Sequence, residues 1–119
     1  MLQNDLYTII ETAGNTVKIK LLPECAIYQG HFPGNPITPG VCQVGIVEEL
    51  LRTCFGKKVT LREIKNLKFI KVLRPEPSVN TAFVFEKMED AGNQLSIRGK
   101  LTVEERIVTK FSLVFEIES

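Results

Sequence analysis

Apolar and polar residues alternate over much of this chain, which is the pattern of β-strands that bury one face. Residues 6–13 form an apolar-rich candidate strand, and after a turn at Gly14 the alternation continues over 16–22. The apolar positions of that second run are Val17, Ile19 and Leu21. Two such runs joined by a glycine-containing turn predict a β-hairpin, and Pro23 ends it.

The second half of the chain repeats the strand pattern. Further extended segments are predicted at 60–73, 81–88, 95–103 and 107–117. Short polar turns at 89–93 and 104–106 separate the last three segments. Successive long strands joined by tight turns imply an antiparallel meander.

Between the hairpin and the later strands, residues 29–40 hold three of the six prolines and three of the eight glycines, which indicates a stiff irregular loop. A helix is predicted from the end of this loop to Phe55, with Thr38 as its cap, Pro39 at its first position and Gly56 as its stop. Its apolar residues are Val41, Val44, Ile46, Val47, Leu50, Leu51, Cys54 and Phe55. They occupy most of the circumference, so the helix is expected to be buried.

One buried helix between a hairpin and a meander predicts an α+β fold, a sheet wrapped around a helix. The length of 119 residues fits a single domain, 1–119. A net charge of +1 gives no general attraction to nucleic acid or membrane, and no nucleic-acid-binding motif is present. No apolar run approaches the roughly 20 residues of a membrane span, and the N-terminus lacks a signal-peptide pattern, so a cytoplasmic protein is expected.

The three cysteines, Cys25, Cys42 and Cys54, are an odd number without CxxC spacing. The chain also has a single histidine, which makes a metal site improbable, and we expect no bound metal. The cysteines are best interpreted as free thiols in a reducing compartment.

That single histidine, His31, lies in the Pro/Gly-rich loop. A histidine in a rigid loop suits a general base, which must be held within hydrogen-bond reach of the proton it removes. Downstream, Gly40 and Val41 begin the helix, whose free N–H groups and dipole can polarise a carbonyl oxygen. A base close to such a helix start suits removal of a proton α to a thioester. The simpler alternatives are a loop histidine bonded to a nearby carbonyl, and an ordinary helix cap.

Residues 31–41, HFPGNPITPGV, resemble the signature of the 3-hydroxyacyl-[acyl-carrier-protein] dehydratases of type II fatty acid synthesis. Residues 64–75, IKNLKFIKVLRP, are similar to the central strand of that family and the turn after it. The resemblance implies a hotdog fold, in which an antiparallel sheet wraps around one long central helix. It also implies a dimer, with the two sheets joined edge to edge and the active sites at the interface.

The resemblance further implies the reaction, which removes water from a 3-hydroxyacyl thioester of acyl carrier protein and leaves a trans-2-enoyl thioester, without a cofactor. His31 would be the base, and Phe32 and Pro33 would flank the substrate. The backbone of Gly40 and Val41 would bind the thioester carbonyl. The carrier protein and a second hotdog subunit, identical or different, would be the partners.

One position departs from the family pattern. The family places an acid fourteen residues after the histidine, and this chain has Gly45 there. The nearest acids, Glu48 and Glu49, lie about 60° and 40° around the helix from Gly45 and about 4.5–6 Å further along it. Either could lean back toward Gly45 as the catalytic acid. Gly45 would also leave room for a water, a bulkier substrate or the tip of Glu49, and both glutamates could instead be solvated or paired with Arg52.

Gln43 offers a second polar group on the same helix. Some dehydratase-like proteins of aryl polyene pathways are similar in having Gln here and a non-acidic residue at the acid position. By that resemblance Gln43 could hold a substrate hydroxyl or a water, although it cannot donate a proton as an acid does. The alternative is a side chain bonded to local backbone.

Residues 52–74 carry eight cationic side chains against a single acid, Glu63. The cations are Arg52, Lys57, Lys58, Arg62, Lys65, Lys68, Lys71 and Arg74. A basic rim would steer an acidic carrier protein to the site. Because strand neighbours point to opposite faces, these charges need not form one patch, and they could simply be solvated.

Three functions remain open from the sequence. The first is an active dehydratase of fatty acid or polyene biosynthesis. The second is a catalytically impaired subunit that pairs with a complete dehydratase or binds its carrier, which Gly45 favours. The third is a hotdog thioesterase, which would need Glu48 or Glu49 to activate water. Fold alone does not separate these classes.

Overall fold

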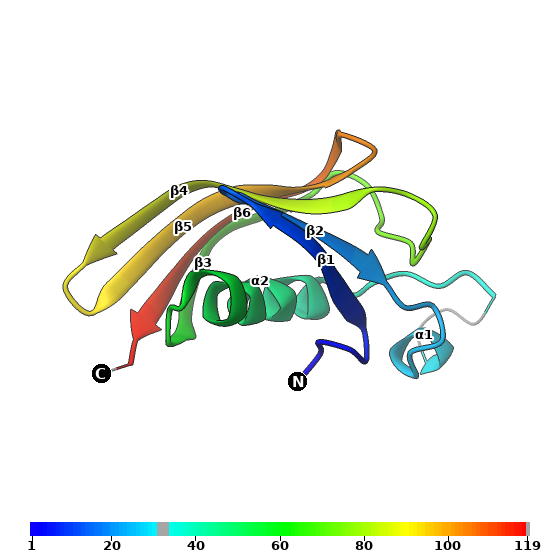
Figure 1. Ribbon diagram of the computed structural model, residues 1–119, viewed down its shortest axis with the longest axis horizontal. Coiled ribbons are helices and arrows are strands. Elements are labelled where there is room, and N and C mark those ends of the chain that lie inside the picture. Colours follow the sequence, from blue (N-terminus) through cyan, green and yellow to red (C-terminus); the bar gives the residue numbers. More distant parts are fainter. Residues whose placement is uncertain (31–33, 119) are drawn as a thin grey trace.

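The computed structural model describes residues 1–30 and 34–118. Within these residues, six strands form one antiparallel sheet around a long helix, α2 (Figure 1). The elements are β1 (Tyr7–Ala13), β2 (Thr16–Leu21), α1 (Ile27–Gly30), α2 (Gly40–Phe55), β3 (Val59–Phe69), β4 (Thr81–Ala91), β5 (Gln94–Val103) and β6 (Arg106–Ile117). The predicted α+β class is confirmed.

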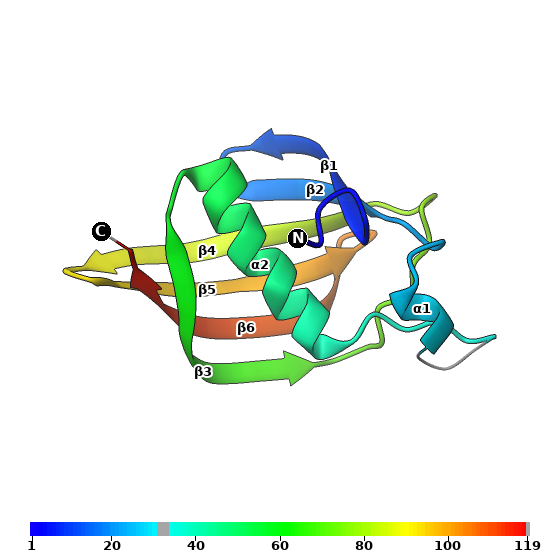
Figure 2. The same ribbon diagram turned by 90° about the horizontal axis from the view of Figure 1, so that it is seen from below.

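The strand order is β1-β2-β4-β5-β6-β3. The predicted hairpin is therefore β1 and β2, and the predicted meander is β4, β5 and β6, with β3 returning to the far edge beside β6. The sheet curves, and α2 lies across its concave face (Figure 2). This is the arrangement of the hotdog fold that the resemblance implies.

The core lies between α2 and the concave face of the sheet. There, every second residue of the strands packs against the buried side of the helix. Phe83, Phe85 and Phe111 form an aromatic cluster, with ring centroids 6.4 Å and 6.1 Å from Phe111. Phe111 crosses over Gly99 on the neighbouring strand. A Cβ on Gly99 would lie 2.7 Å from the Phe111 ring and would also collide with the Val84 carbonyl, so this position requires glycine.

The start of α2 differs from the prediction. Pro39 is the N-cap residue rather than the first helical residue, and no side chain caps the helix. The predicted cap, Thr38, instead shares a 2.7 Å hydrogen bond between its hydroxyl and that of Tyr28, because α1 brings the tyrosine beside it. The predicted stop is confirmed: Gly56 has φ 64° and its N–H donates to the Leu51 carbonyl.

The strand predicted over 60–73 is shorter than expected, since β3 ends at Phe69. Ile70 and Lys71 both donate to the Val108 carbonyl, at 2.8 Å and 3.1 Å, so one acceptor serves two donors and the regular ladder stops. Along β3 most side chains are exposed, because the strand forms an edge of the sheet. The short helix α1 was not anticipated from the sequence.

Among the described residues, no helix is long and apolar enough to cross a membrane. The same residues contain no cluster of three or more His, Cys, Asp or Glu that could hold a metal ion. All three cysteines are free thiols. Burial, with a smaller contribution from Cys25, raises the pKa of the Cys42 thiol.

Candidate functional site

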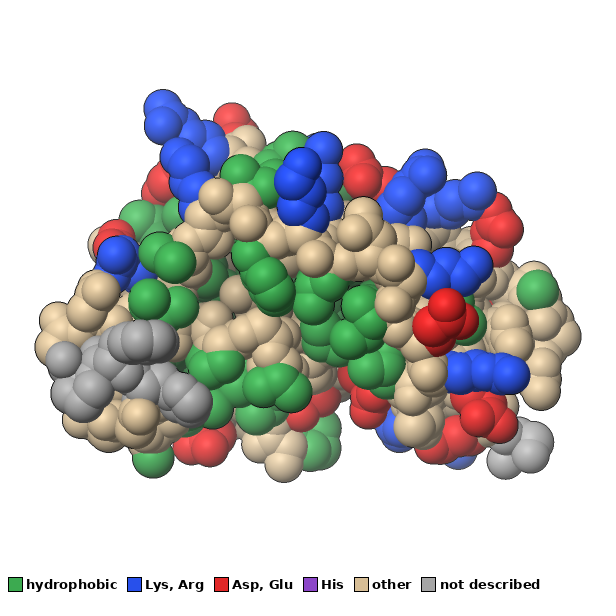
Figure 3. All heavy atoms as spheres, turned by 180° about the vertical axis from the view of Figure 1, so that it is seen from behind, with side chains coloured by type: hydrophobic (Ala, Val, Ile, Leu, Met, Phe, Trp, Pro, Cys, Tyr) green, Lys and Arg blue, Asp and Glu red, His purple; other side chains and the backbone are tan. Residues whose placement is uncertain are grey.

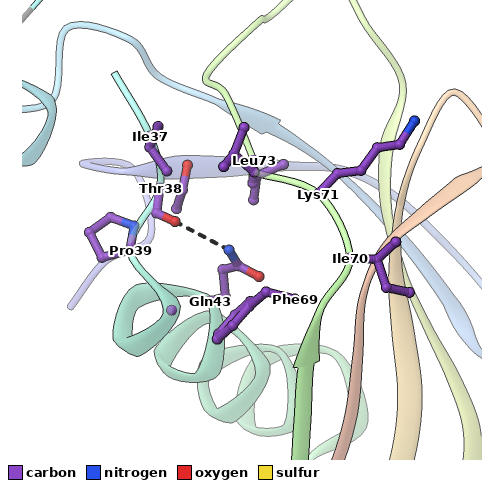
Figure 4. Close-up of a pocket in the computed structure, with 10 residues that line it drawn as sticks. Ile37, Thr38, Pro39, Gln43, Phe69, Ile70, Lys71 and Leu73 are labelled. Carbon is purple, nitrogen blue, oxygen red and sulfur yellow. Dashed lines mark hydrogen bonds between the residues drawn. The ribbon is translucent and has the colours of Figure 1, made fainter. Parts of the chain in front are cut away.

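A cavity of about 280 Å³ opens at the start of α2 (Figure 4). Three segments line it: the loop over 37–39, the first turn of α2, and the stretch 69–73, which begins at the last residue of β3. The Thr38 N–H donates to the Leu73 carbonyl at 2.7 Å, which joins the loop to the third segment. The walls are mostly apolar, as expected of a site for a small organic group.

Gly40 is in place at the helix start, and the group that approaches it closely is the ring of Phe69. A Cβ on residue 40 would collide with the ring tip and lie 3.1 Å from Cε2. The Phe69 side chain is 51% exposed, so the ring has room to move outward. The first turn of α2 is thus approachable only because residue 40 has no side chain.

Gly40 and Gly99 each lie under a phenylalanine ring, but substitution by alanine should destabilise the protein to different extents at the two positions. Gly99→Ala is expected to lower the free energy of unfolding by about 2–3 kcal/mol or more, since both Phe111 and the Val84 carbonyl are held in the core. Gly40→Ala should cost less than about 1 kcal/mol, because Phe69 can swing into solvent and alanine favours the helix. Urea unfolding of both variants measures the difference, and equal losses would contradict the assignment of Phe69 as movable.

Gln43 forms the polar floor of the cavity (Figure 4). Its Nε2 donates to the Thr38 carbonyl at 3.2 Å, and its Oε1 accepts from the Thr109 hydroxyl at 2.7 Å. Both ends of this buried amide are therefore committed to protein partners, and they tie the loop, α2 and β6 together. The role of Gln43 in holding a substrate hydroxyl stays a prediction. To play it, Gln43 would have to exchange its hydrogen bond with Thr38 or Thr109 for one with the substrate.

The loop is also held from its other side. Tyr28 on α1 is buried and bonds to the Thr38 hydroxyl. Burial raises the pKa of Tyr28 to about 12, against a smaller opposing effect of that hydrogen bond. The phenol is therefore neutral at physiological pH, and it serves as a fixed support for the loop.

Glu49, one of the two predicted acids, binds the N-terminal loop. Its carboxylate accepts from the backbone N–H groups of Leu2 at 2.7 Å and Gln3 at 2.9 Å, and from the Tyr7 hydroxyl at 3.0 Å. Tyr7 is fully buried; burial, and then the charge of Glu49, raise the pKa of its hydroxyl. These three hydrogen bonds give Glu49 a structural task and weigh against its prediction as the catalytic acid.

Glu48 is also engaged. Its Oε2 accepts from the Leu61 backbone N–H at 3.0 Å, beside a bulge in β3. Arg52, the alternative partner considered for both glutamates, pairs instead with Glu118 at 3.3 Å and donates to the Val59 carbonyl. Glu48 thus links α2 to β3, and its catalytic role stays a prediction.

The space beside Gly45 is taken by an apolar side chain. A Cβ on residue 45 would lie 2.9 Å from Cδ1 of Leu2. Two of the hydrogen bonds of Glu49 hold the backbone of Leu2 and Gln3 against α2, and they bring the Leu2 side chain to this place. The sequence left a water, a bulkier substrate or the tip of Glu49 open as the occupant of this space, and nothing in its pattern pointed to Leu2.

The other predicted site residues belong to the HFPG loop and to the start of α2. His31, Phe32 and Pro33 lie outside the described residues, so their roles stay predictions. Val41, on the first turn of α2, is 81% exposed and projects away from the core. The backbone N–H groups of Gly40 and Val41 find no acceptor among the described residues, whereas the next two N–H groups donate to the Pro39 carbonyl.

The eight cations of residues 52–74 do not form one patch. This agrees with the alternation of side chains between the two faces of a strand. Lys57, for example, pairs with Asp90 at 3.0 Å, far from the cavity. Lys71 and Arg74 line a second cavity of about 220 Å³, together with Arg106. This second cavity shares Lys71 and Val72 with the first, so positive charge lies beside the helix-start cavity.

Comparison with known proteins gives the family. The family model described as "ApeI-like: ApeI dehydratase" matches residues 9–108. The 3-hydroxyacyl-[acyl-carrier-protein] dehydratase FabZ of Lactobacillus helveticus (strain DPC 4571) is 33% identical over 98 residues, covering 74% of this chain and 63% of that protein. The chain spans about half to two thirds of the length of the curated relatives it matches.

Solved structures agree on the fold. The dehydratase heterocomplex ApeI:P from Xenorhabdus doucetiae has a TM-score of 0.67 at 19% identity, covering 89% of this chain and 92% of that one. A hypothetical thioesterase from Streptococcus pneumoniae TIGR4, solved with coenzyme A, has a TM-score of 0.65 at 13% identity, covering 95% and 86%. These identities show the hotdog fold alone. Because the family model matches most of its length, the chain belongs to the ApeI-like dehydratase family.

Proposed function

We propose that this chain is a dehydratase that removes water from 3-hydroxyacyl thioesters of acyl carrier protein and forms trans-2-enoyl thioesters, in fatty acid or polyene biosynthesis. The observation that carries the proposal is the cavity at the start of α2, lined by residues 37–40 a few positions downstream of His31. The family membership supports the reaction class.

The chemistry follows from two groups. The N–H groups of Gly40 and Val41 would donate to the thioester carbonyl oxygen as it gains negative charge, because they have no acceptor among the described residues. His31 would take the proton from C2 of the acyl group. The bond between C3 and oxygen then breaks, the double bond forms between C2 and C3, and the leaving hydroxide takes a proton to become water.

The source of that last proton distinguishes two candidates. In an autonomous enzyme the protonated His31 would return it, since Glu48 and Glu49 are engaged in structural hydrogen bonds. The second candidate is a subunit that depends on a different hotdog chain for the acid. The packing of Leu2 against Gly45 favours this candidate, because it leaves an apolar surface where the family places its acid.

We also propose that subunits pair across the β3 edge. Figure 3 views the molecule from the β3 side, and hydrophobic side chains gather in the middle of that face. The large exposed apolar residues of this region are Ile64, Phe69, Ile70 and Val72. An eleven-residue edge strand with exposed apolar side chains is a template for pairing with another sheet. The partner would be a second copy or a different hotdog subunit.

The carrier protein would dock beside the cavity mouth. Lys71, Arg74 and Arg106 surround the second cavity, with Glu76 as the acid among the lining residues. This excess of positive charge suits an acidic carrier and the phosphate of its phosphopantetheine arm. The shared wall at Lys71 and Val72 would lead the arm from this basic mouth into the first cavity.

The test uses the purified chain with a 3-hydroxyacyl carrier protein, scored by mass for the loss of water. Enoyl product from the chain alone supports the first candidate. Product that forms only after a second hotdog subunit is added supports the second candidate. Absence of turnover in both mixtures would overturn the dehydratase proposal, and release of a free acid would show a thioesterase instead.

A further inference from the structure

Three lysines form a row across neighbouring strands on the convex face of the sheet, opposite α2. Lys68 of β3 pairs directly with Lys110 of β6, and Lys110 pairs directly with Lys100 of β5. Their inward-facing neighbours, such as Phe111, lie in the core, so the three lysines point outward together. The row cannot be recognised in the sequence, because its three lysines are on three different strands.

The row concentrates like charge. Neighbouring strands lie about 4.8 Å apart, and like charges directly opposite each other are destabilising. Lys100 has Glu86 at 3.7 Å, whereas Lys68 and Lys110 have no ion-pair partner among the described residues. Arg98, two residues from Lys100 on the same face of β5, adds a fourth positive charge. Glu86 therefore offsets one of the four positive charges in this compact cationic cluster, and the other three have no ion-pair partner among the described residues.

Three members of the cluster, Arg98, Lys100 and Lys110, line a hollow of about 380 Å³, and Glu86 lines it as well. In the next cross-strand row, Asn66 of β3 lies opposite Ser112 of β6, so the side chains are short there, and Arg98 of β5 continues the row. One row further along, Glu63 and Glu89 occupy the two ends of the same convex face. Acids therefore lie on one side of the positive surface and Glu86 lies within it, so the run of positive charge along this groove is short, which disfavours a long uniform polyanion such as a nucleic acid.

We propose that this groove binds an acidic α-helix of another protein. Acidic residues spaced i, i+4 and i+7 lie on one face of a helix and span about 10.5 Å of its axis. The row from Lys68 to Lys100 spans two strand spacings, or about 9.6 Å. A helix laid across the strands would place one carboxylate over each lysine, while its body rests in the hollow. Charge complementarity and spacing together identify this occupant.

This surface is separate from the proposed catalytic site. The helix-start cavity and α2 lie on the concave side of the sheet, whereas the lysine row lies on the convex side. Lysine and arginine side chains stand along the upper, convex edge of the molecule in Figure 3. Docking here leaves the cavity open, so the proposal does not depend on the dehydratase activity.

The test uses two alanine-rich helical peptides of equal length and composition. The first carries three glutamates at i, i+4 and i+7, on one face, and the second carries them at i, i+5 and i+10, around the helix. Calorimetry at low salt should show the first peptide binding about tenfold more tightly than the second. Lys110→Glu should weaken the first peptide by about tenfold or more, whereas Lys20→Glu, the same charge change on β2, should alter it less than about twofold.

Several outcomes would overturn the proposal. Equal affinity for the two peptides would mean that the row has no preferred spacing. Equal losses in Lys110→Glu and Lys20→Glu would mean that only net charge is sensed. Single-stranded DNA that binds as tightly as the first peptide, and is lost in Lys110→Glu, would assign the groove to nucleic acid. Circular dichroism of both variants confirms that each remains folded.

Discussion

Replacement of His31 by alanine is expected to lower kcat/KM for dehydration by about a hundredfold or more, since a positioned general base contributes about 10²–10⁴ in rate. His31 is the single histidine of the chain, so no second imidazole can substitute for it. It belongs to the Pro/Gly-rich loop and lies close in sequence to the residues that line the helix-start cavity. The variant should therefore fold normally and bind substrate while losing turnover.

The measurement is enoyl formation under saturating 3-hydroxyacyl carrier protein, with urea unfolding as the check on folding. His31→Gln is the matched control, because its amide can hydrogen-bond but cannot take a proton at neutral pH. Both variants should lose kcat with little change in KM. Turnover within about threefold of the parent chain in either variant would exclude His31 as the base.

Replacement of Glu49 by alanine is expected to lower the free energy of unfolding by about 2–4 kcal/mol, because hydrogen bonds to a charged group contribute about 1.5–3 kcal/mol each and these are partly solvent-exposed. The change removes the acceptor of the Leu2 and Gln3 N–H groups and of the Tyr7 hydroxyl. Tyr7 is fully buried, so its hydroxyl would be left without a partner. The N-terminal loop would also lose its attachment to α2.

Glu48→Ala is the matched control on the same helix, with a single hydrogen bond to lose, and should cost about 1 kcal/mol. Urea unfolding of both variants gives the comparison. Activity per folded molecule then separates the two roles of Glu49. A structural Glu49 predicts that Glu49→Gln keeps most turnover. Complete loss of turnover in Glu49→Gln, with stability near that of the parent, would restore Glu49 as the catalytic acid.

Local features were predictable because local chemistry decides them. The strand alternation identified the faces of β2 and β4 through β6, and Gly56 ended α2 because only a glycine readily adopts its left-handed conformation. The helix start was misjudged by one residue. Thr38 has the right chemistry for a cap, but the hydroxyl of Tyr28 competes for it, and that competitor comes from a helix too short to show periodicity.

The partners of the polar site residues were not predictable in the same way. Glu49 binds backbone groups more than 40 residues away, and Gln43 accepts from Thr109 across a separation of 66 residues. No pattern within the helix records these contacts. The helix geometry did place Glu48 and Glu49 on either side of Gly45, but which groups they meet depends on how the N-terminal loop and β3 pack against α2.

By itself, then, the sequence determined the hairpin, the long helix, the meander and the position of the HFPG loop before that helix, because periodicity, turn residues and motif spacing are local properties. The hotdog class came from the resemblance of that loop to the dehydratases. Tertiary structure alone decided that Leu2 covers Gly45 and that Lys68, Lys110 and Lys100 stand in one row. Both depend on the register and packing of segments far apart in the chain. The long-range contacts that form the core place side chains beside one another that the sequence keeps apart.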